Sequence, residues 1–129
     1  MSIRAVHTDK APSPKGAYSQ GVVANGFLYT AGFGPHDPVS GQLVGTNAAE
    51  QTVQVLANVQ AVLATEGLDL SDVVKTTVHL HDLDADFKDF NAAYEKAFSE
   101  PYPVRTTVGS RLAGILVEID VVAALRSAG

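Results

Sequence analysis

Two charged residues interrupt apolar segments near the end of the sequence, and they are the first candidates for chemistry. Arg105 lies in the segment 103–107, and Glu118 lies in the apolar segment 115–119. A guanidinium group offers a planar fork of donors that suits a carboxylate. A carboxyl group in apolar surroundings is suited to moving protons. The alternative is that the two residues form a structural ion pair, or that Glu118 points at solvent, because ion pairs also occur within strands.

Tyr18 and Asn91 are weaker candidates for binding a ligand. Tyr18 lies in the segment Gly16-Ala17-Tyr18-Ser19-Gln20, at the start of a predicted strand. A tyrosine there can bind a ligand, but it more often packs its ring and leaves its hydroxyl in water. Asn91 falls inside a predicted helix, where asparagine is unfavourable, so it is either exposed or bound to a buried partner. Neither residue is specific by itself.

His79 and His81 project from the same side of a predicted strand, and a His-x-His pair can bind a metal. Nothing else in the sequence supplies a convergent third ligand, so we interpret the pair as the polar end of a strand and predict no metal site. The segment Gly32-Phe33-Gly34 lacks the lysine and the spacing of a phosphate-binding loop. A Ser-His-Asp triad stays open, although no Gly-x-Ser-x-Gly turn is present.

The elements that must position these residues follow from local patterns. Asn25-Gly26 separates two β-prone runs, which is the strongest short hairpin signal. Apolar residues at helical spacing predict two helices, and alternation with a period of two predicts a strand between them. The first helix is capped by Thr46 or Asn47 and ends before Gly67. The second begins near Asp84 or Asp86, buries Phe87, Phe90, Tyr94, Ala97 and Phe98, and is ended by Pro101 and Pro103. The predicted order is strands 18–24 and 27–31, a loop 32–45, a helix with its stripe over 52–63, strand 73–80, the second helix, and strands 104–108 and 115–125.

Two helices are too few to cover both faces of such a sheet, so we place both on one face of a mixed sheet. The segment 115–125 is largely apolar on both faces, which is typical of a strand that is covered on two sides. We therefore expect an α+β protein with a single domain over residues 1–129. A neighbouring subunit would cover the other face of its sheet.

Composition narrows the classes of function. The 129 residues are 46% hydrophobic and 18% charged, which predicts ordinary globular folding. The net charge of -5 and the scattered basic residues argue against a nucleic-acid partner. The absence of cysteine excludes disulfides and thiolate chemistry. Because the sequence shows no signal peptide and no apolar segment long enough to span a membrane, we expect a cytoplasmic protein without a membrane partner.

Several segments, spread over nearly the whole chain and in the same order, resemble the RidA/YjgF family. They are Ala11-Pro12, Gly16-Ala17-Tyr18-Ser19-Gln20, Ala31-Gly32 with Pro35 and Pro38-x-x-Gly41, Gln51 through Asn58-Val59, Asp72-Val73-Val74-Lys75-Thr76-Thr77-Val78, Phe87 to Asn91 with Tyr94, Pro103-Val104-Arg105-Thr106, and Val117-Glu118-Ile119. The resemblance implies a chorismate-mutase-like α+β fold, assembled as a homotrimer with clefts between subunits. It also implies an enzyme that needs no cofactor and hydrolyses 2-aminoacrylate, 2-iminobutanoate and related enamine or imine acids to 2-keto acids and ammonia.

The same resemblance implies roles for individual residues. Arg105 matches the group that binds the substrate carboxylate, Glu118 matches the acid/base residue, and Tyr18 and Asn91 match other residues of the cleft.

Further positions match the substrate-binding part of the cleft but differ in residue type. Ala31 stands where related deaminases often carry serine, and Thr107 stands where they carry cysteine, so their backbone amides would be the groups left to contact the ligand. Phe33 follows Gly32 in place of a common glutamine and would make the pocket more apolar.

Two alternative functions stay open. Some members of the family are described as translation inhibitors with ribonuclease activity or as chaperone-like binders, and the acidic charge balance argues against the RNA-directed role. A deaminase acting on a different, pathway-specific aminoacrylate or aminomuconate is the other alternative.

Overall fold

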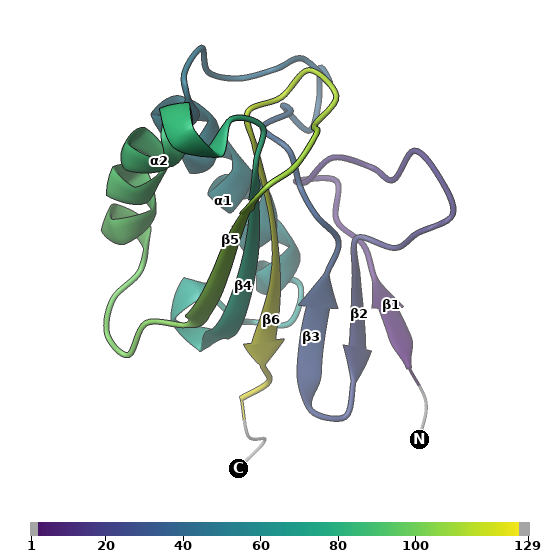
Figure 1. Cartoon of the computed structure of the whole chain (residues 1–129). Coiled ribbons are helices and arrows are strands. Elements are labelled where there is room, and N and C mark those ends of the chain that lie inside the picture. Colours follow the sequence, from purple (N-terminus) through teal and green to yellow (C-terminus); the bar gives the residue numbers. More distant parts are fainter. Residues whose placement is uncertain (1–2, 127–129) are drawn as a thin grey trace.

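A computed structural model describes residues 3–126 of the chain as one sheet with two helices (Figure 1). The elements are β1 (Arg4–Val6), β2 (Gly21–Ala24), β3 (Phe27–Thr30), α1 (Ala48–Ala64), a short 3-10 helix η1 (Leu70–Asp72), β4 (Val73–Leu80), α2 (Leu83–Ala97), β5 (Val104–Gly109) and β6 (Val117–Ala124).

The sheet is mixed. Its six strands run in the order β1-β2-β3-β6-β4-β5, and all neighbours are antiparallel except β4 and β5, which are parallel. A parallel pair needs a crossover, and α2 supplies it. Both helices lie on the same face of the sheet (Figure 1). The expected α+β arrangement, a mixed sheet with two helices on one face, is confirmed.

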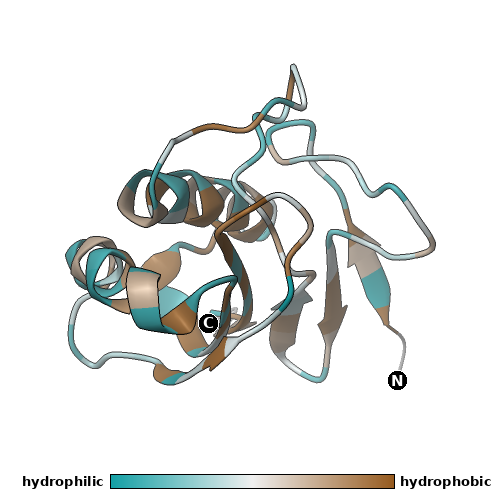
Figure 2. Cartoon of the chain, turned by 45° about the horizontal axis from the view of Figure 1, so that its top comes forward, coloured by the Kyte–Doolittle hydropathy of each residue, from teal (hydrophilic) through white to brown (hydrophobic). Residues whose placement is uncertain are grey.

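The hydrophobic core lies between the two helices and the face of the sheet that they cover. It contains Val117, Ile119, Val121 and Ala123 of β6. From α1 it contains Val55, Leu56, Val59, Val62 and Leu63. Figure 2 shows the strands mostly in brown, the colour of hydrophobic residues, and the loops mostly in teal or white. The apolar stripe predicted for α1 is confirmed. Asn47 caps the helix by accepting a hydrogen bond from the Glu50 N–H.

The predicted start of α2 was wrong. Asp82, not Asp84 or Asp86, is the N-cap, and its side chain accepts a hydrogen bond from the Ala85 N–H. The chain turns into the helix two residues after β4 ends, so Asp84 and Asp86 fall in the first helical turn, where carboxylates favour the positive end of the helix dipole. Phe87, expected in the buried stripe, is 38% exposed.

The ends of several strands also differ from prediction. β2 begins at Gly21, so Tyr18 belongs to a loop, and β6 begins at Val117 and ends at Ala124. β1 was missed because three residues are too few to show an alternating pattern. The Asn25-Gly26 turn is confirmed, with φ of 52° and 87° at the two residues.

Gln20 holds the loop that precedes β2. It is 1% exposed, and its Nε2 donates to the carbonyls of Thr8, Ala11 and Pro12, while its Oε1 accepts from the Thr8 N–H. Buried backbone polar groups must be paired, so one side chain fixes the path of residues 8–12. These hydrogen bonds between Gln20 and residues 8–12 explain why residues 18–20, which were predicted to belong to the strand, lie outside the sheet.

Gln20→Leu is expected to destabilise the protein by about 2–4 kcal/mol, because it keeps the volume but leaves several buried backbone groups unpaired. Urea unfolding at a fixed protein concentration measures the change. Gln42→Leu, at an exposed position, is the matched control. Equal unfolding midpoints for the two variants would show that the Gln20 hydrogen bonds contribute no net stability.

The other face of the sheet, which we call the open face, is covered by no helix of the described chain (Figure 1). Its exposed apolar side chains are Phe27 and Tyr29 of β3 and Val104 and Val108 of β5. On β6 the open face carries Glu118 and Asp120 besides Val122 and Ala124, so that strand is less apolar on this side than expected. Burial raises the pKa of the Asp120 carboxyl, and the nearby His79 and Lys75 oppose this shift.

Candidate functional site

All but two of the predicted site residues line one of two pockets of the described chain. The first, which we call the Glu118 pocket, has a volume of about 430 Å³ and is lined by Tyr18, Gly32, Phe33 and Glu118 with parts of the segments 12–15, 34–41 and Ile115. The second, the Arg105 pocket, has a volume of about 300 Å³ and is lined by Asn91, Tyr94, Glu95, Tyr102, Pro103 and Arg105. Both volumes suit small ligands.

The Arg105 pocket forms where the edge strand β5 meets α2. The Arg105 Nη1 donates to Asn91 Oδ1 at 2.8 Å, and the Asn91 Nδ2 donates to Glu95 Oε1 at 3.0 Å. A guanidinium only donates and a carboxylate only accepts, so these two partners fix the orientation of the Asn91 amide. The sequence left two alternatives for Asn91, exposure or a buried partner. The structure lies between them, because Asn91 and its partner Arg105 are both half-buried.

Aromatic rings of α2 hold the guanidinium from one side. Its central carbon lies 4.8 Å from the ring centroid of Tyr94 and 5.5 Å from that of Phe90, within the range of cation–π contacts. Tyr94 is buried, and its hydroxyl lies 2.8 Å from Thr76 Oγ1. Burial raises the pKa of Tyr94, while the Thr76 contact and the Arg105 charge lower it. Tyr94 was predicted only as core. Its position three residues after Asn91 was the available signal for a site residue.

Thr107 lines neither pocket. It lies two residues after Arg105 on β5, opposite Val78 of β4. Its Oγ1 is the one buried side-chain oxygen or nitrogen of residues 3–126 that has no hydrogen-bond partner.

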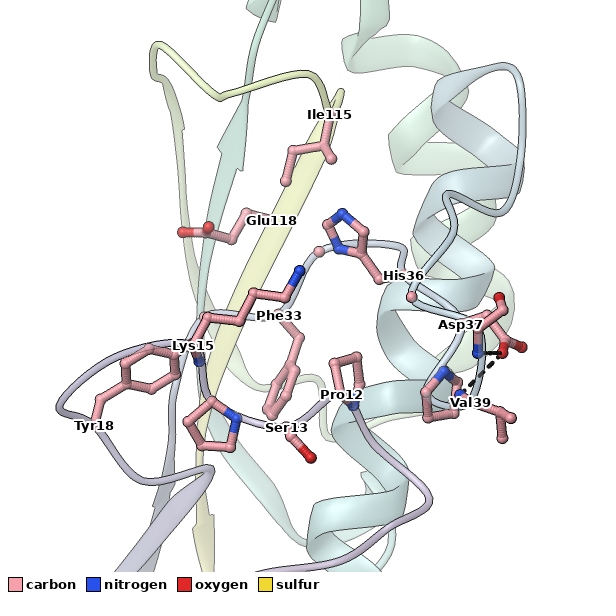
Figure 3. Close-up of a pocket in the computed structure, with 16 residues that line it drawn as sticks. Pro12, Ser13, Lys15, Tyr18, Phe33, His36, Asp37, Val39, Ile115 and Glu118 are labelled. Atoms are coloured by element: carbon pink, nitrogen blue, oxygen red, sulfur yellow. Dashed lines mark hydrogen bonds between the residues drawn. The ribbon is translucent and has the colours of Figure 1, made fainter.

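The Glu118 pocket lies beside β6, where the chain leaves β3 (Figure 3). A Cβ atom at Gly32 would lie 2.8 Å from Glu118 Oε2, so the absence of a side chain there lets the carboxylate pack against the backbone. Phe33 is buried, pairs with Ile119 through backbone hydrogen bonds, and supplies an apolar wall.

Ala31 does not reach this pocket. Its N–H donates to the Gln20 carbonyl at 2.9 Å, so the amide expected to contact a ligand is already engaged, and the residue is absent from the pocket lining.

Tyr18 lies in the wall of the Glu118 pocket and is 54% exposed. Its hydroxyl accepts a hydrogen bond from the Lys15 N–H at 3.3 Å, so the hydroxyl is engaged rather than simply solvated. Lys15 and His36 line the same pocket and were missed. They lie in loops without periodic patterns, and the sequence offered no signal for them.

His79 and His81 have separate partners. His79 Nδ1 lies 2.6 Å from Ser110 Oγ, and His81 Nδ1 accepts from the Leu112 N–H at 3.0 Å. Within residues 3–126, no three His, Cys, Asp or Glu side chains come together in a way that could hold a metal. Neither helix of this described part has the length and apolar character needed to cross a membrane.

Arg105 and Glu118 do not form an ion pair. Arg105 lies opposite Thr76, which faces the helices, whereas Glu118 lies opposite His79 on the open face. The two side chains thus belong to opposite faces of the sheet, two strands apart. One chain therefore places the two predicted catalytic residues in separate pockets, one with a guanidinium group and one with a carboxyl group.

A mixed sheet with two helices on one face, and with two small pockets lined by polar and apolar residues, is typical of proteins that bind small molecules. The family model described as Endoribonuclease L-PSP matches residues 8–125. A RutC family protein of Saccharolobus solfataricus is 47% identical over 120 residues, which cover 92% of this chain and 94% of the relative. The chain belongs to the RidA/YjgF family.

Two further relatives carry more specific names. The chloroplastic Reactive Intermediate Deaminase A of Arabidopsis thaliana is 41% identical over 122 residues, covering 93% of this chain and 65% of that protein. The crystal structure of RidA from an Antarctic Psychrobacter species superposes with a TM-score of 0.88 at 35% identity, covering 95% of this chain and 99% of that one.

Proposed function

We propose that this protein is an enamine/imine deaminase that converts 2-aminoacrylate or 2-iminobutanoate-type intermediates to 2-keto acids and ammonia, acting in the cytoplasm as a homotrimer. The observation that carries the proposal is the pair of complementary half-sites, with Arg105 oriented in one and Glu118 placed in the other. The plant relative named Reactive Intermediate Deaminase A supports it.

Arg105 would bind the substrate carboxylate. Asn91 engages only its Nη1, so other N–H groups of the fork stay available for an acid group. The aromatic rings on one side restrict its rotamers, which lowers the entropy lost when a ligand binds. Fixing the carboxylate would place C2 of the imine at a defined position.

Glu118 would position and activate the water. The oxygen of that water bonds to C2 of the imine while one of its protons passes to the carboxylate, and the imine nitrogen is protonated. A second proton transfer to nitrogen makes ammonia the leaving group, and the C2–N bond breaks as the C2=O bond of the keto acid forms. Protons return to solvent, so the net reaction consumes one water. Phe33 and Ile115 would limit competing water in this pocket.

A homotrimer would bring the half-sites together. A cyclic assembly uses two different surfaces of each subunit, so the Arg105 pocket of one protomer can meet the Glu118 pocket of the next. The uncovered apolar side chains Phe27, Tyr29, Val104 and Val108 supply a surface for such contact. Trimer formation would therefore hide the open face and complete three clefts.

The test couples the protein to a threonine dehydratase and follows release of 2-ketobutanoate in the presence of an imine trap such as semicarbazide. The proposal expects faster keto-acid release and less trapped imine than in a blank without the protein. Indistinguishable traces over a wide range of protein concentration would refute the deaminase.

An RNA-directed role is the second candidate, favoured by the description of the matching family model. The net charge of -5 weighs against binding of a polyanion. RNA binding that falls steeply with salt, together with RNA cleavage by the purified protein, would support this role instead.

Gly32→Ala is expected to lower kcat about 10-fold or more while leaving the fold intact. The new Cβ would lie within 3.2 Å of three Glu118 side-chain atoms and must displace the carboxylate from its position. The dehydratase-coupled assay measures the rate. Gly16→Ala is the control in the same pocket region, because its Cβ makes only ordinary contacts of 3.7 Å with Tyr18. Equal rates for the two variants would show that the exact position of Glu118 has no effect.

A further inference from the structure

The Glu118 pocket contains two basic side chains that the proposed deamination does not use. Lys15 and His36 both line the pocket, and Figure 3 shows the Lys15 side chain extending into it toward the His36 ring. Within residues 3–126, Lys15 forms no salt bridge. An ammonium group directed into a pocket without an acidic partner is a binding group for an anion.

The segment that carries Lys15 is held in place. Its N–H donates to the Tyr18 hydroxyl at 3.3 Å, and the Tyr18 N–H donates to the Gly16 carbonyl at 2.9 Å. The chain just before it is fixed by the Gln20 hydrogen bonds to Ala11 and Pro12. The base of the lysine side chain is thus positioned before any ligand binds, which limits the entropy that binding costs.

Two carboxylates also line the pocket, and neither neutralises Lys15 by direct contact. Asp37 accepts hydrogen bonds from the N–H groups of Val39 and Ser40 at 3.0 and 2.8 Å, and these bonds lower its pKa. Figure 3 shows this turn on the far side of His36 from Lys15. Glu118 is the carboxylate assigned to water in the proposed reaction. The side chains of Lys15 and His36 are therefore available to bind an acidic group of a ligand.

We propose that Lys15 and His36 form a subsite for a second acid group, so that the preferred substrates are imino dicarboxylic acids. This inference rests on the proposed deaminase function. The C1 carboxylate would bind Arg105 of a neighbouring protomer, and the side-chain carboxylate would bind Lys15 and His36. The volume of about 430 Å³ leaves room for a chain longer than that of 2-iminobutanoate. The reaction that supplies such a substrate is oxidation of an acidic α-amino acid at its amine.

Binding of two keto acids of equal chain length tests the subsite without catalysis. Calorimetry compares 2-oxoglutarate with 2-oxopentanoate, which lacks the terminal carboxylate. The wild-type protein is expected to bind 2-oxoglutarate about 10-fold more tightly, as one ion pair in a partly enclosed pocket allows. Lys15→Gln should bring the two affinities together by weakening only 2-oxoglutarate, and Lys15→Arg should keep most of the preference.

Lys10→Gln is the matched control, because it removes the same charge from the same loop outside the pocket. It should leave both affinities unchanged. Equal affinities in the wild type, or a preference that survives Lys15→Gln, would overturn the subsite. Loss of binding of both keto acids in Lys15→Gln but not in Lys15→Arg would also overturn it. Lys15 would then bind a group that both keto acids share, and not the terminal carboxylate of 2-oxoglutarate.

Rates with imines separate this inference from the proposed function. An amino acid oxidase acting on glutamate or on norvaline supplies the two imines of matched length. Hydrolysis of both at the same efficiency, with equal keto-acid affinities, would leave the deaminase standing and reject the subsite. Hydrolysis of neither imine, with the 2-oxoglutarate preference intact, would reject the deaminase and leave a dicarboxylate-binding site.

Discussion

Arg105→Ala is expected to lower kcat/KM for 2-iminobutanoate by about 100-fold or more, down to the rate of the blank. Two charge-assisted hydrogen bonds to a carboxylate are lost, each contributing roughly 1.5–3 kcal/mol. The substrate then loses both its affinity and its orientation, because no other cation lines the Arg105 pocket within the described chain. The dehydratase-coupled assay, with the imine trap present, gives the rate directly.

Arg105→Lys separates charge from geometry. It keeps a cation but loses the planar fork, the contact to Asn91 in its present form and part of the aromatic stacking. We expect an intermediate loss of about 10-fold, mainly in KM. Arg4→Ala, which breaks an exposed ion pair with Glu66, is the control and should retain full activity. If Arg105→Ala hydrolyses imine as fast as the Arg4 control, the assigned role of Arg105 is wrong.

Mixing two inactive variants is expected to restore activity. Arg105→Ala and Glu118→Gln each destroy one half-site and leave the other intact, because the two residues line different pockets. Random reassembly of equal amounts into trimers joins an intact Arg105 pocket to an intact Glu118 pocket in about one cleft of four. Activity should therefore rise from background to about a quarter of the wild-type value, since each complete cleft works alone.

The experiment uses co-expression with two affinity tags or joint refolding of the two variants, followed by the coupled assay. Each variant refolded alone gives the background, and the molar mass of the mixture by light scattering confirms the assembly state. A trimeric mixture with no recovered activity would contradict a cleft in which Arg105 of one protomer works with Glu118 of the next. A stable monomer with wild-type activity would contradict the shared cleft outright.

Local patterns were sufficient for most of the secondary structure. The Asn25-Gly26 turn, the stripe of α1 and the alternation in β4 depend on neighbours in sequence, so they could be predicted. The start of β2 could not, because the Gln20 side chain binds carbonyls eight to twelve residues away and draws the preceding segment out of the sheet. The prediction of the α2 start was wrong for a simpler reason. Three aspartates near the start of the helix could each cap it, and Asp82 is the cap because of where β4 ends.

The sequence predicted which residues belong to the candidate site better than it predicted where those residues lie in the fold. The charges at Arg105 and Glu118 in apolar strands were visible, but which face each one takes depends on register across β4. The Asn91 contact to Arg105 joins a helix to a strand fourteen residues later. The Ala31 amide was predicted to contact a ligand. It instead donates a hydrogen bond to the Gln20 carbonyl within the fold, which the sequence pattern could not show.

The placement of the tyrosines gives the protein a built-in optical reporter. It has four tyrosines and no tryptophan, so its ultraviolet emission comes from tyrosine alone. Tyr18 lines the Glu118 pocket, Tyr94 and Tyr102 line the Arg105 pocket, and Tyr29 is exposed on the uncovered side of the sheet. Unlabelled protein can therefore signal ligand capture and subunit docking by changes in intrinsic fluorescence, with each ring assignable by a Tyr→Phe substitution.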